Sequence, residues 1–440
     1  MITQTEQMSY RLSILNTQQQ KLTYQTSTQE KLQEGSDDSM LYSRIILVDE
    51  KVRTYEGLKS QIQKTKVQND MADSSMAEVK KILENIKEQL VKANTATTTN
   101  DGLTAIASSI AGLKENLFQL ANTQVENEYV FAGSNSSIQP FEKDANGKIT
   151  YLGDSQLRKV AIEEGSYRER GITGFDMMTY PSSTAYKGET FTFKETDRII
   201  DQGGNEWKMR VPISGANLTF SSAQGILDSN NNIWTLNASN QLVDSLGNIN
   251  SASVTDNLNG TYTFTVPASE SMRINDIVKY DINTNQIVDT IALSGNDGLT
   301  PATFSVVLPN VDGTKFEAKT NIFDLIDATV NALKKVDSSG NPISAEDARA
   351  LVANYQGEVD KAYDTVNIAH ADLGGKNKIF EISLERVSSK LTQFDILSRN
   401  LGSVDLAQVA IESKALELTY TALYSTISKT NQLSLVNFLN

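Results

Sequence analysis

Proline is missing from both ends of this chain and is confined to its middle. All seven prolines lie between Pro140 and Pro342, so the first 139 and the last 98 residues contain none. Because proline removes a backbone donor and clashes inside a helix, its absence allows long uninterrupted helices. The two ends are therefore predicted to be helical arms. The middle holds both tryptophans and sixteen of the 25 glycines, which indicates a turn-rich insert.

Cysteine is absent, and His370 is the only histidine. Disulfides and thiolate metal sites are therefore excluded, and a Ser-His-acid triad would have to use this one residue. His370 stands shortly before Gly374-Gly375, which predicts a histidine at a helix end that interacts with the helix dipole. We therefore expect no catalytic residue, no cofactor and no metal site.

Charge and hydropathy argue against nucleic acid and against membrane insertion. The chain carries 54 acidic and 40 basic side chains, a formal charge of −14, whereas phosphate binding needs a basic face. No apolar run approaches the ~20 residues of a membrane span. The first residues lack a basic patch followed by an apolar core, so a secretory signal peptide is not predicted, and any export would retain the amino terminus.

Apolar residues recur in both arms at the alternating three- and four-residue spacing of a coiled coil. In the first arm these positions are Met8, Leu12, Leu15, Gln19 and Leu22. In the last arm they are Leu406, Val409, Ser413, Leu416, Tyr420, Leu423 and Ile427, and the apolar residues Leu433, Leu435, Val436 and Phe438 follow. We predict that these two sets form an assembly interface, in which the polar Gln19, Ser413 and Thr430 fix the register.

The other faces of the arms carry unusually few charges. Residues 1–30 contain four charged side chains and residues 401–440 contain five. An ordinary exposed helix opposes its apolar stripe with a charged face, whereas uncharged polar faces are covered by another protein at modest cost. We expect the arms to be disordered before assembly and buried by neighbouring subunits afterwards. The alternative is an intramolecular antiparallel bundle with ordinary surface exposure.

Turn and breaker residues divide the chain into three predicted domains. The Gly35–Asp38 turn interrupts the first arm, and Gly374-Gly375 predicts a helix break near the other end. In between, a strand is expected over Tyr129–Ser134, a hairpin at Asn146-Gly147, and short antiparallel strands thereafter. The predicted fold is α+β and multidomain. Its parts are a terminal coiled coil of 1–40 with 401–440, a helical rod of 41–140 with 321–400, and a β-rich domain of 141–320 with one or two subdomains.

A few acidic groups invite a chemical interpretation. Asp228–Asn232 and Asp281–Asn285 begin like calcium loops, but both lack glycine at the sixth position and glutamate at the twelfth. Hairpin turns are the default for such Asp- and Asn-rich segments. Glu163-Glu164 offers a carboxylate pair of the kind that glycosidases use, yet no aromatic-lined pocket can be argued around it.

Four segments carry a resemblance to a known family. The first is a shortened turn made of Gly35, Ser36, Asp37 and Asp38. The second leaves the helical region through Tyr129, Phe131, Gly133, Ser134, Pro140 and Phe141. The third runs from Tyr151-Leu-Gly-Asp154 to Gly174-Phe-Asp176, and the fourth from Asp405 to Leu439. Together they resemble the flagellin-like axial proteins of the bacterial flagellum over about residues 1–180 and 320–440. The third segment resembles junction subunits of that family rather than flagellin.

The resemblance implies a non-enzymatic structural subunit of the extracellular flagellum that joins the hook to the filament. Such a subunit assembles through its terminal helices into a ring or tube and templates flagellin polymerisation, while its β-rich domain projects outward. The implied partners are other copies of the chain, the hook-side junction protein, flagellin and a chaperone of type III export. Two alternatives stay open: a flagellin of the filament itself, and a secreted coiled-coil adhesin whose β insert binds a ligand.

Overall fold

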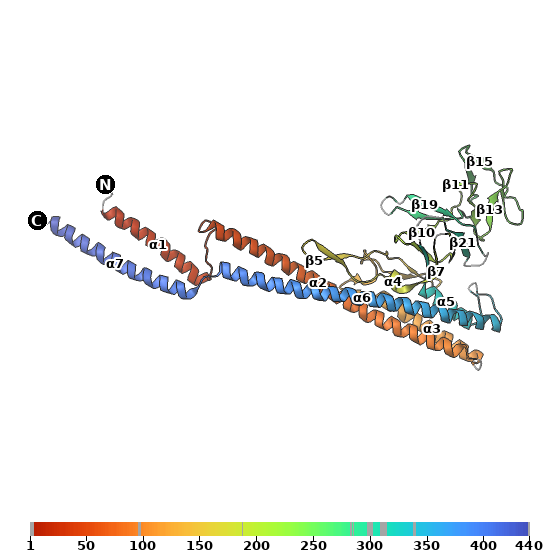
Figure 1. The fold of residues 1–440 in the computed structure, drawn as a ribbon, viewed down its shortest axis with the longest axis horizontal. Coiled ribbons are helices and arrows are strands. Elements are labelled where there is room, and N and C mark those ends of the chain that lie inside the picture. The colour runs from red at the N-terminus through yellow and green to blue at the C-terminus, as the bar shows by residue number, and fades with distance from the viewer. Residues whose placement is uncertain are drawn as a thin grey trace. The chain divides into compact units, whose positions relative to one another are not determined.

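The structure is a computed structural model that describes residues 4–95, 98–186, 188–281, 284, 286–296, 302–308, 315–337 and 340–438. Side chains are described for these residues except 4, 5 and 430–438. The predicted fold class is confirmed, because long helices near both ends of the sequence flank a region of antiparallel strands (Figure 1). Contacts within the chain define two compact units. The first is Met1–Lys66, Lys159–Arg168 and Lys378–Asn440, and the second is Val67–Arg158 and Glu169–Asn377. The three-domain division stays a prediction.

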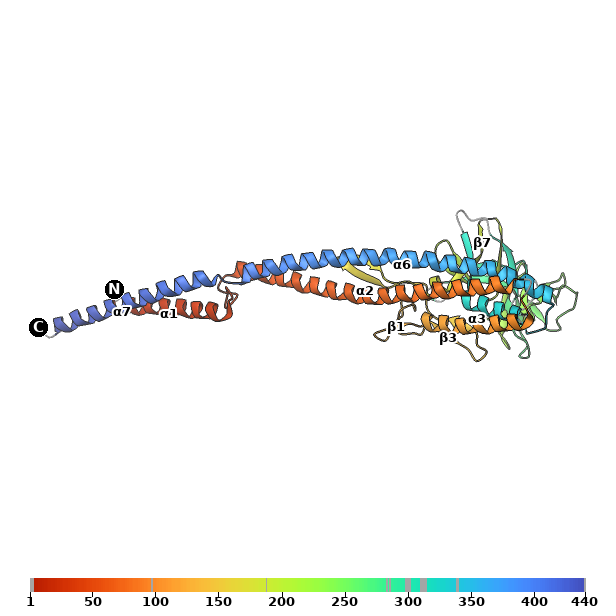
Figure 2. The same ribbon diagram turned by 90° about the horizontal axis from the view of Figure 1, so that it is seen from below.

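In the first unit, α1 (Gln4–Thr28) and α7 (Leu406–Phe438) lie side by side in both views (Figures 1 and 2). The unit also contains the beginning of α2 (Ser39–Ala93), the end of α6 (Ala345–Gly402), and most of the hairpin β5 (Lys159–Glu163) and β6 (Ser166–Glu169). These last elements share a core that consists of Tyr55, Leu58, Ile62, Val160, Ile162, Phe380, Val387 and Leu391. The unit is therefore well packed where α2 meets α6 and the hairpin.

The carboxylates of Glu163 and Glu164 are both engaged at the rim of this core. Glu163 forms ion pairs with Lys390 and Arg386, and Glu164 pairs with Lys51 at 2.7 Å. The Lys390 ammonium lowers the pKa of Glu163. The two glutamates therefore attach the hairpin to α2 and α6.

The second unit has a helical part built from the rest of α2 and α6 with α3 (Asn100–Ala121), α4 (Gly174–Met178) and α5 (Ile322–Leu333). Asn321 caps α5, because its side chain accepts from the Phe323 amide at 3.0 Å. Phe323 is fully buried and packs edge-on against Phe141, with ring centroids 5.4 Å apart. Short two-stranded ribbons border this part: β1 (Gln124–Val125) with β2 (Glu128–Tyr129), and β3 (Phe141–Lys143) with β4 (Ile149–Tyr151).

The β-rich part of the second unit contains two separate apolar cores. One involves a six-stranded antiparallel sheet ordered β19 (Ile287–Ala292), β18 (Asp276–Tyr280), β10 (Glu206–Met209), β9 (Arg198–Asp201), β22 (Lys315–Asn321) and β7 (Thr179–Tyr186). A small sheet of β20 (Gly295–Asn296), β21 (Thr303–Val307) and β8 (Thr190–Lys194) contributes to the same core. The other core involves β11 (Asn217–Ser221), β16 (Thr261–Thr265) and β15 (Val254–Asp256), together with β14 (Leu242–Val243), β13 (Ile233–Leu236), β12 (Ile226–Asp228) and β17 (Met272–Ile274).

One loop design recurs through this unit, although the sequence shows no clear repeat. In each loop, an Asp or Asn side chain at position i accepts a hydrogen bond from the backbone amide of residue i+4. Residue i+3 has a positive φ. Such loops begin at Asp144, Asp201, Asp228, Asn237, Asp244 and Asp337. Trp207 and Trp234 donate their indole N–H to Asp201 and Asp228, each at 3.0 Å. The Asp228 segment is thus a hairpin turn as expected, while Asn283 and Asn285 of the Asp281 segment lie outside the described residues.

Two predictions about local structure were wrong. Helix α6 continues through Gly374-Gly375, because the buried Leu373 and Phe380 on either side pack into cores that offset the ~1 kcal/mol cost of each helical glycine. The predicted strand over Tyr129–Ser134 ends at Tyr129, since the Phe131 carbonyl accepts from the Gly174 amide at 2.7 Å instead of from a strand partner.

The prediction that His370 stands at a helix end was also wrong. Because α6 does not break at Gly374, His370 lies well inside the helix rather than at its end. Its Nε2 lies 3.0 Å from the Asp73 carboxylate of α2, and its Nδ1 lies 3.5 Å from Lys80. The imidazole therefore links two helices within the second unit.

Candidate assembly interface

The coiled-coil positions of α1 and α7 face a shared seam that is only partly closed. Leu22 of α1 and Val409 of α7 are buried. Most of the other predicted seam residues are half-buried, namely Met8, Leu12, Leu15, Leu416, Tyr420, Leu423 and Ile427. The Tyr420 hydroxyl lies 2.6 Å from the Asn16 side chain across the seam. The structure thus brings the two predicted sets together within one chain.

Several predicted seam residues do not enter the seam. Gln19 and Ser413 are exposed, so neither forms a buried polar layer within the single chain, and Leu406 is also largely exposed. Thr430 and the apolar residues after it fall where side chains are not described; the latter are Leu433, Leu435, Val436 and Phe438. The assembly roles of all these residues stay predictions.

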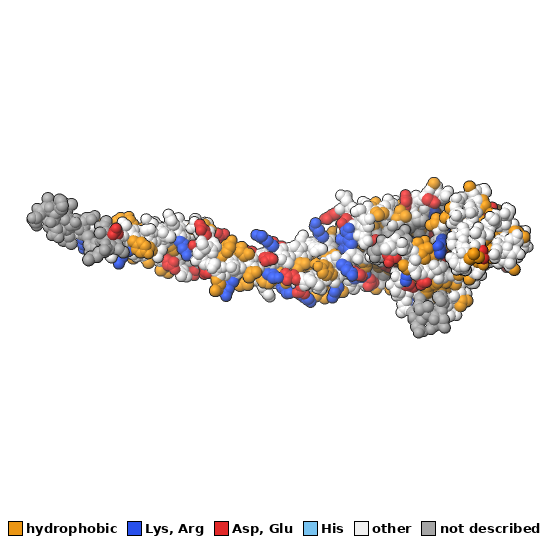
Figure 3. All heavy atoms as spheres, turned by 90° about the horizontal axis from the view of Figure 1, so that it is seen from above, with side chains coloured by type: hydrophobic (Ala, Val, Ile, Leu, Met, Phe, Trp, Pro, Cys, Tyr) orange, Lys and Arg blue, Asp and Glu red, His pale blue; other side chains and the backbone are white. Residues whose placement is uncertain are grey.

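Sequence reasoning missed a second apolar set, on the opposite side of α7. Ile411 is 71% exposed and Leu418 is 65% exposed. Ile411 and Leu418 are seven residues apart and each stands two residues after a seam position, so both point away from α1. On α1, Tyr10 is 69% exposed. Figure 3 shows apolar side chains (orange) on the arm surface beside the grey terminal atoms. The seven-residue spacing of Ile411 and Leu418 was the signal that could have revealed them.

The Gly35–Asp38 turn connects α1 to α2 and caps α2. The Asp38 carboxylate accepts from the Leu41 amide at 2.9 Å, which satisfies a free donor at the start of α2. Asp37 accepts the amides of Glu34 and Gln33, and these hydrogen bonds lower the pKa of its carboxyl group. A Cβ at Gly35 would meet the Tyr42 ring at 3.0 Å. Ser36 is exposed, so the turn sets the direction of the chain rather than a binding pocket.

The residues predicted to leave the helical region pack against the third family-like segment. The Phe131 carbonyl accepts from the Tyr151 hydroxyl at 3.1 Å, and the Ser134 amide donates to Asp154 at 2.9 Å. Gly133 has a φ of +86°, and a Cβ there would lie 2.3 Å from the Asp154 carboxylate. Phe141 packs on Tyr151, and its carbonyl accepts from the Asn122 side chain. The Tyr129 amide donates to the Ser136 carbonyl, and the Leu152 amide donates to the Pro140 carbonyl. The second and third family-like segments therefore form one packed cluster.

An ion-pair network centred on Glu128 lies next to these two packed segments. The Glu128 carboxylate accepts from Arg170 at 2.9 Å, from Gln68 at 2.8 Å and from Arg158 at 3.2 Å. The Arg170 guanidinium is the main cause that lowers the pKa of Glu128 to about 2, and Gln68 and Arg158 add to it. The network ties α2 to the segments on either side of the hairpin, which is a structural role.

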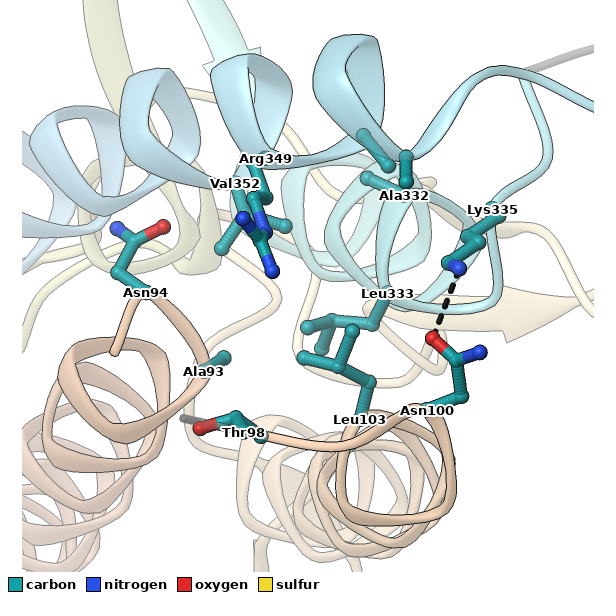
Figure 4. Close-up of a pocket in the computed structure, with 12 residues that line it drawn as sticks. Ala93, Asn94, Thr98, Asn100, Leu103, Ala332, Leu333, Lys335, Arg349 and Val352 are labelled. Atoms are coloured by element: carbon teal, nitrogen blue, oxygen red, sulfur yellow. Dashed lines mark hydrogen bonds between the residues drawn. The ribbon is translucent and has the colours of Figure 1, made fainter. Parts of the chain in front are cut away.

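The best-formed cavity in the described part of the chain is too small for a substrate. It has a volume of about 30 Å³ and lies where α3 and α6 begin and α5 ends (Figure 4). Lys335 at its rim donates to Asn100 at 2.8 Å, as the dashed line marks. Small-molecule sites typically measure about 300–1,000 Å³, whereas this space suits a water molecule or two. A second hollow of about 470 Å³ is lined by residues 46–54 of α2 alone, so it is an open depression on one helix.

Within the described ranges, no group of three or more His, Asp or Glu side chains is placed to hold a metal ion. No helix among those residues has both the length and the apolar character to cross a bilayer.

Comparison with known proteins defines the class. Residues 2–136 match the family model of the bacterial flagellin N-terminal helical region. The flagellar hook-associated protein 3 of Escherichia coli K12 is 26% identical over 230 residues, which cover 50% of this chain and 69% of the relative. The protein of the same name from Salmonella typhimurium LT2 is 24% identical, over 48% of this chain and 66% of the relative. The chain is therefore similar to flagellin over its N-terminal helical region and to flagellar hook-associated proteins over about half of its length.

A solved structure of a flagellar hook-associated protein-3 from Legionella pneumophila is also similar. It is 15% identical, with a TM-score of 0.46, and the match covers 81% of this chain and 98% of that one.

Proposed function

We propose that this chain is a structural subunit at the junction between the hook and the filament of the bacterial flagellum. The observation that carries the proposal is the outer face of α7, where Ile411 and Leu418 are exposed although the seam with α1 is already formed. Exposed apolar side chains at regular spacing on a helix call for a protein partner. The curated relatives named hook-associated protein 3 point to the junction as the place where that partner is found.

In this proposal the partner of the outer face is the arm pair of a neighbouring copy. The seam between α1 and α7 holds the pair together, and the outer residues close against the next pair in a ring or tube. The hook-side junction protein and flagellin contact the two ends of that ring, so that the ring templates flagellin polymerisation. The subunit acts outside the cell, after unfolded export with a chaperone, and performs no catalysis.

Deletion of the gene tests the role in the cell. A strain that lacks this chain should keep intact hooks and release unpolymerised flagellin into the medium, measured by electron microscopy and by immunoblot of the culture supernatant. Complete filaments on the deletion strain would contradict a junction role. Loss of the filament protein itself, with hooks and junctions unchanged, would favour the flagellin alternative.

Paired substitutions test the outer face of α7. Ile411→Ser with Leu418→Ser should leave monomer stability unchanged but reduce assembly at least about tenfold, because burial of each side chain contributes roughly 1.5–3 kcal/mol. The readout is the fraction of cells with filaments after complementation of the deletion strain. Val211→Ser with Leu246→Ser is the matched control, since both residues lie on the β-rich part and are at least as exposed as Ile411 and Leu418. Equal assembly by the two double variants would count against the proposal.

Truncation of both arms distinguishes the proposed structural subunit from the adhesin alternative. A chain without residues 1–30 and 410–440 should remain a folded monomer that no longer assembles. If instead the same truncated chain keeps full binding to a surface or glycan that the intact protein binds, the adhesin alternative is favoured.

A further inference from the structure

The two segments that join the arms to the long helices are hydrogen-bonded to each other. Glu30 and Ser403 form an antiparallel β-bridge. The Lys31 amide donates to the Gly402 carbonyl at 2.7 Å, and the Val404 amide donates to the carbonyl of residue 29 at 3.0 Å. Because these bonds flank the pair instead of joining it, Glu30 and Ser403 form a non-hydrogen-bonded pair. The Cα atoms of such pairs lie about 4.5 Å apart.

Side chains from both arms brace this bridge. The buried Gln25 donates its Nε2 to the Lys31 carbonyl at 2.8 Å, and the Lys31 ammonium reaches the Asn400 carbonyl at 2.9 Å. Gln29 has a φ of +63°, a left-handed conformation that non-glycine residues adopt only when the surroundings hold them there. The Asp405 carboxylate accepts from the Ala407 amide at 2.8 Å and caps α7. The bridge is therefore held in place by several side-chain hydrogen bonds.

Burial along the arms decreases with distance from this bridge. The buried side chains of the arm pair, among those described, are Leu22, Gln25 and Val409, all within about two helical turns of the bridge. Farther along the seam, Leu15 and Leu423 are only half-buried. The pairing of α1 with α7 is thus tightest at the bridge and loosest toward the chain ends.

We propose that the Gln29–Lys31 and Gly402–Val404 bridge is a register clamp that aligns α1 with α7 before any other subunit is present. Helices in proteins gain most of their stability from packing, and joining two of them costs loop-closure entropy. The packing of α2 on α6 already brings the two linkers together, so the clamp needs only local ordering. The arms then pair from the clamp outward and enter a polymer as one aligned unit. The last step rests on the proposed function, whereas the clamp is a property of the free chain.

Disulfide trapping tests the clamp in the full-length protein, which has no cysteine of its own. Glu30→Cys with Ser403→Cys places two thiols at the facing pair, within the reach of a disulfide. Glu30→Cys with Val404→Cys is the control, because adjacent residues of an extended strand point to opposite faces. In a glutathione redox buffer, the first variant should form its intramolecular disulfide at least about tenfold faster. Equal rates would overturn the clamp.

A second pair of variants removes the hydrogen bond while keeping the thiols. Val404→Pro eliminates the amide that donates to residue 29, and proline is tolerated there because α7 begins only at Leu406. Added to the facing cysteine pair, Val404→Pro should slow trapping to the control rate, whereas Val404→Ala should keep it within about twofold. Unchanged trapping in the proline variant would show that the bridge does not align the arms.

These results are independent of the cellular role. Fast trapping in the monomer together with complete filaments on a deletion strain would keep the clamp and reject the junction function. Slow trapping together with flagellin release would do the opposite.

Discussion

Helices α5 and α7 are both rich in apolar residues, yet they use them in different ways. α5 buries eight of its twelve residues in the core of the second unit. α7 buries Val409 alone among its described side chains, although it is 33 residues long. The difference shows that α5 is complete within one chain, whereas α7 carries apolar surface that one partner helix does not cover. Stability and assembly should therefore respond to substitutions in different parts of the molecule.

The largest contrast is expected between one buried and one exposed side chain. Phe323→Ala removes a fully buried ring from α5 and should lower the free energy of unfolding by about 3–5 kcal/mol. Leu418→Ala in α7 should change it by less than about 0.5 kcal/mol, because the side chain is already in water. Urea denaturation of the monomer measures both. Similar losses for the two variants would erase the distinction between the helices.

A half-buried carboxyl group in α5, that of Asp324, makes the stability of this helix depend on pH. Desolvation raises the pKa of Asp324 to about 6, so the folded state binds more protons than the unfolded state between about pH 4 and pH 6. Stability is therefore lost as pH rises through this window. Asp324→Asn should stabilise the protein at pH 7 by about 1–2 kcal/mol and have little effect at pH 4.

The neighbouring carboxylate provides the control for Asp324. Asp327 pairs with Lys114 at 2.6 Å, and the Lys114 side chain is only 12% exposed. Asp327→Asn should therefore destabilise the protein at pH 7 by about 1–2 kcal/mol, because it leaves a half-buried ammonium without its partner. Stabilisation by both substitutions would mean that general charge repulsion, not local burial, sets their effects.

The Glu128 network gives a smaller effect of opposite sign. Its lowered pKa means that the stabilising ion pairs are fully formed above about pH 4.5 and are lost as pH falls toward 2. Because the side chain is 36% exposed, solvent screening limits the contribution to about 1 kcal/mol or less. Glu128→Gln should flatten the pH dependence of the thermal midpoint between pH 5 and pH 2.5. If the thermal midpoint of the variant depends on pH as in the original protein, groups other than Glu128 cause the acid sensitivity.

Local signals in the sequence predicted local structure well. Asn146-Gly147 was expected to form a hairpin and lies between β3 and β4. Caps and tight turns depend on a few neighbouring residues, so their chemistry can be recognised without knowing the rest of the fold.

Features that depend on distant contacts were not predictable in the same way. Gly374-Gly375 breaks an isolated helix, but the cores that α6 packs into hold it straight. The strand expected after Tyr129 was replaced by bonds from Phe131 to Tyr151 and Gly174, which lie far ahead in the sequence. The bridge between Glu30 and Ser403 joins residues from opposite ends of the chain, and no spacing within either segment signals it.

Amide hydrogen exchange of the isolated monomer, followed residue by residue, tests the central claim most directly. The account predicts that α5 amides exchange only with an opening free energy of several kcal/mol, while those of α1 and α7 beyond the clamp exchange with an opening free energy near 0–2 kcal/mol. The same arm amides should become protected once the subunit polymerises. Slow exchange along the whole of α1 and α7 in a dilute, monomeric sample, equal to that of α5, would contradict it.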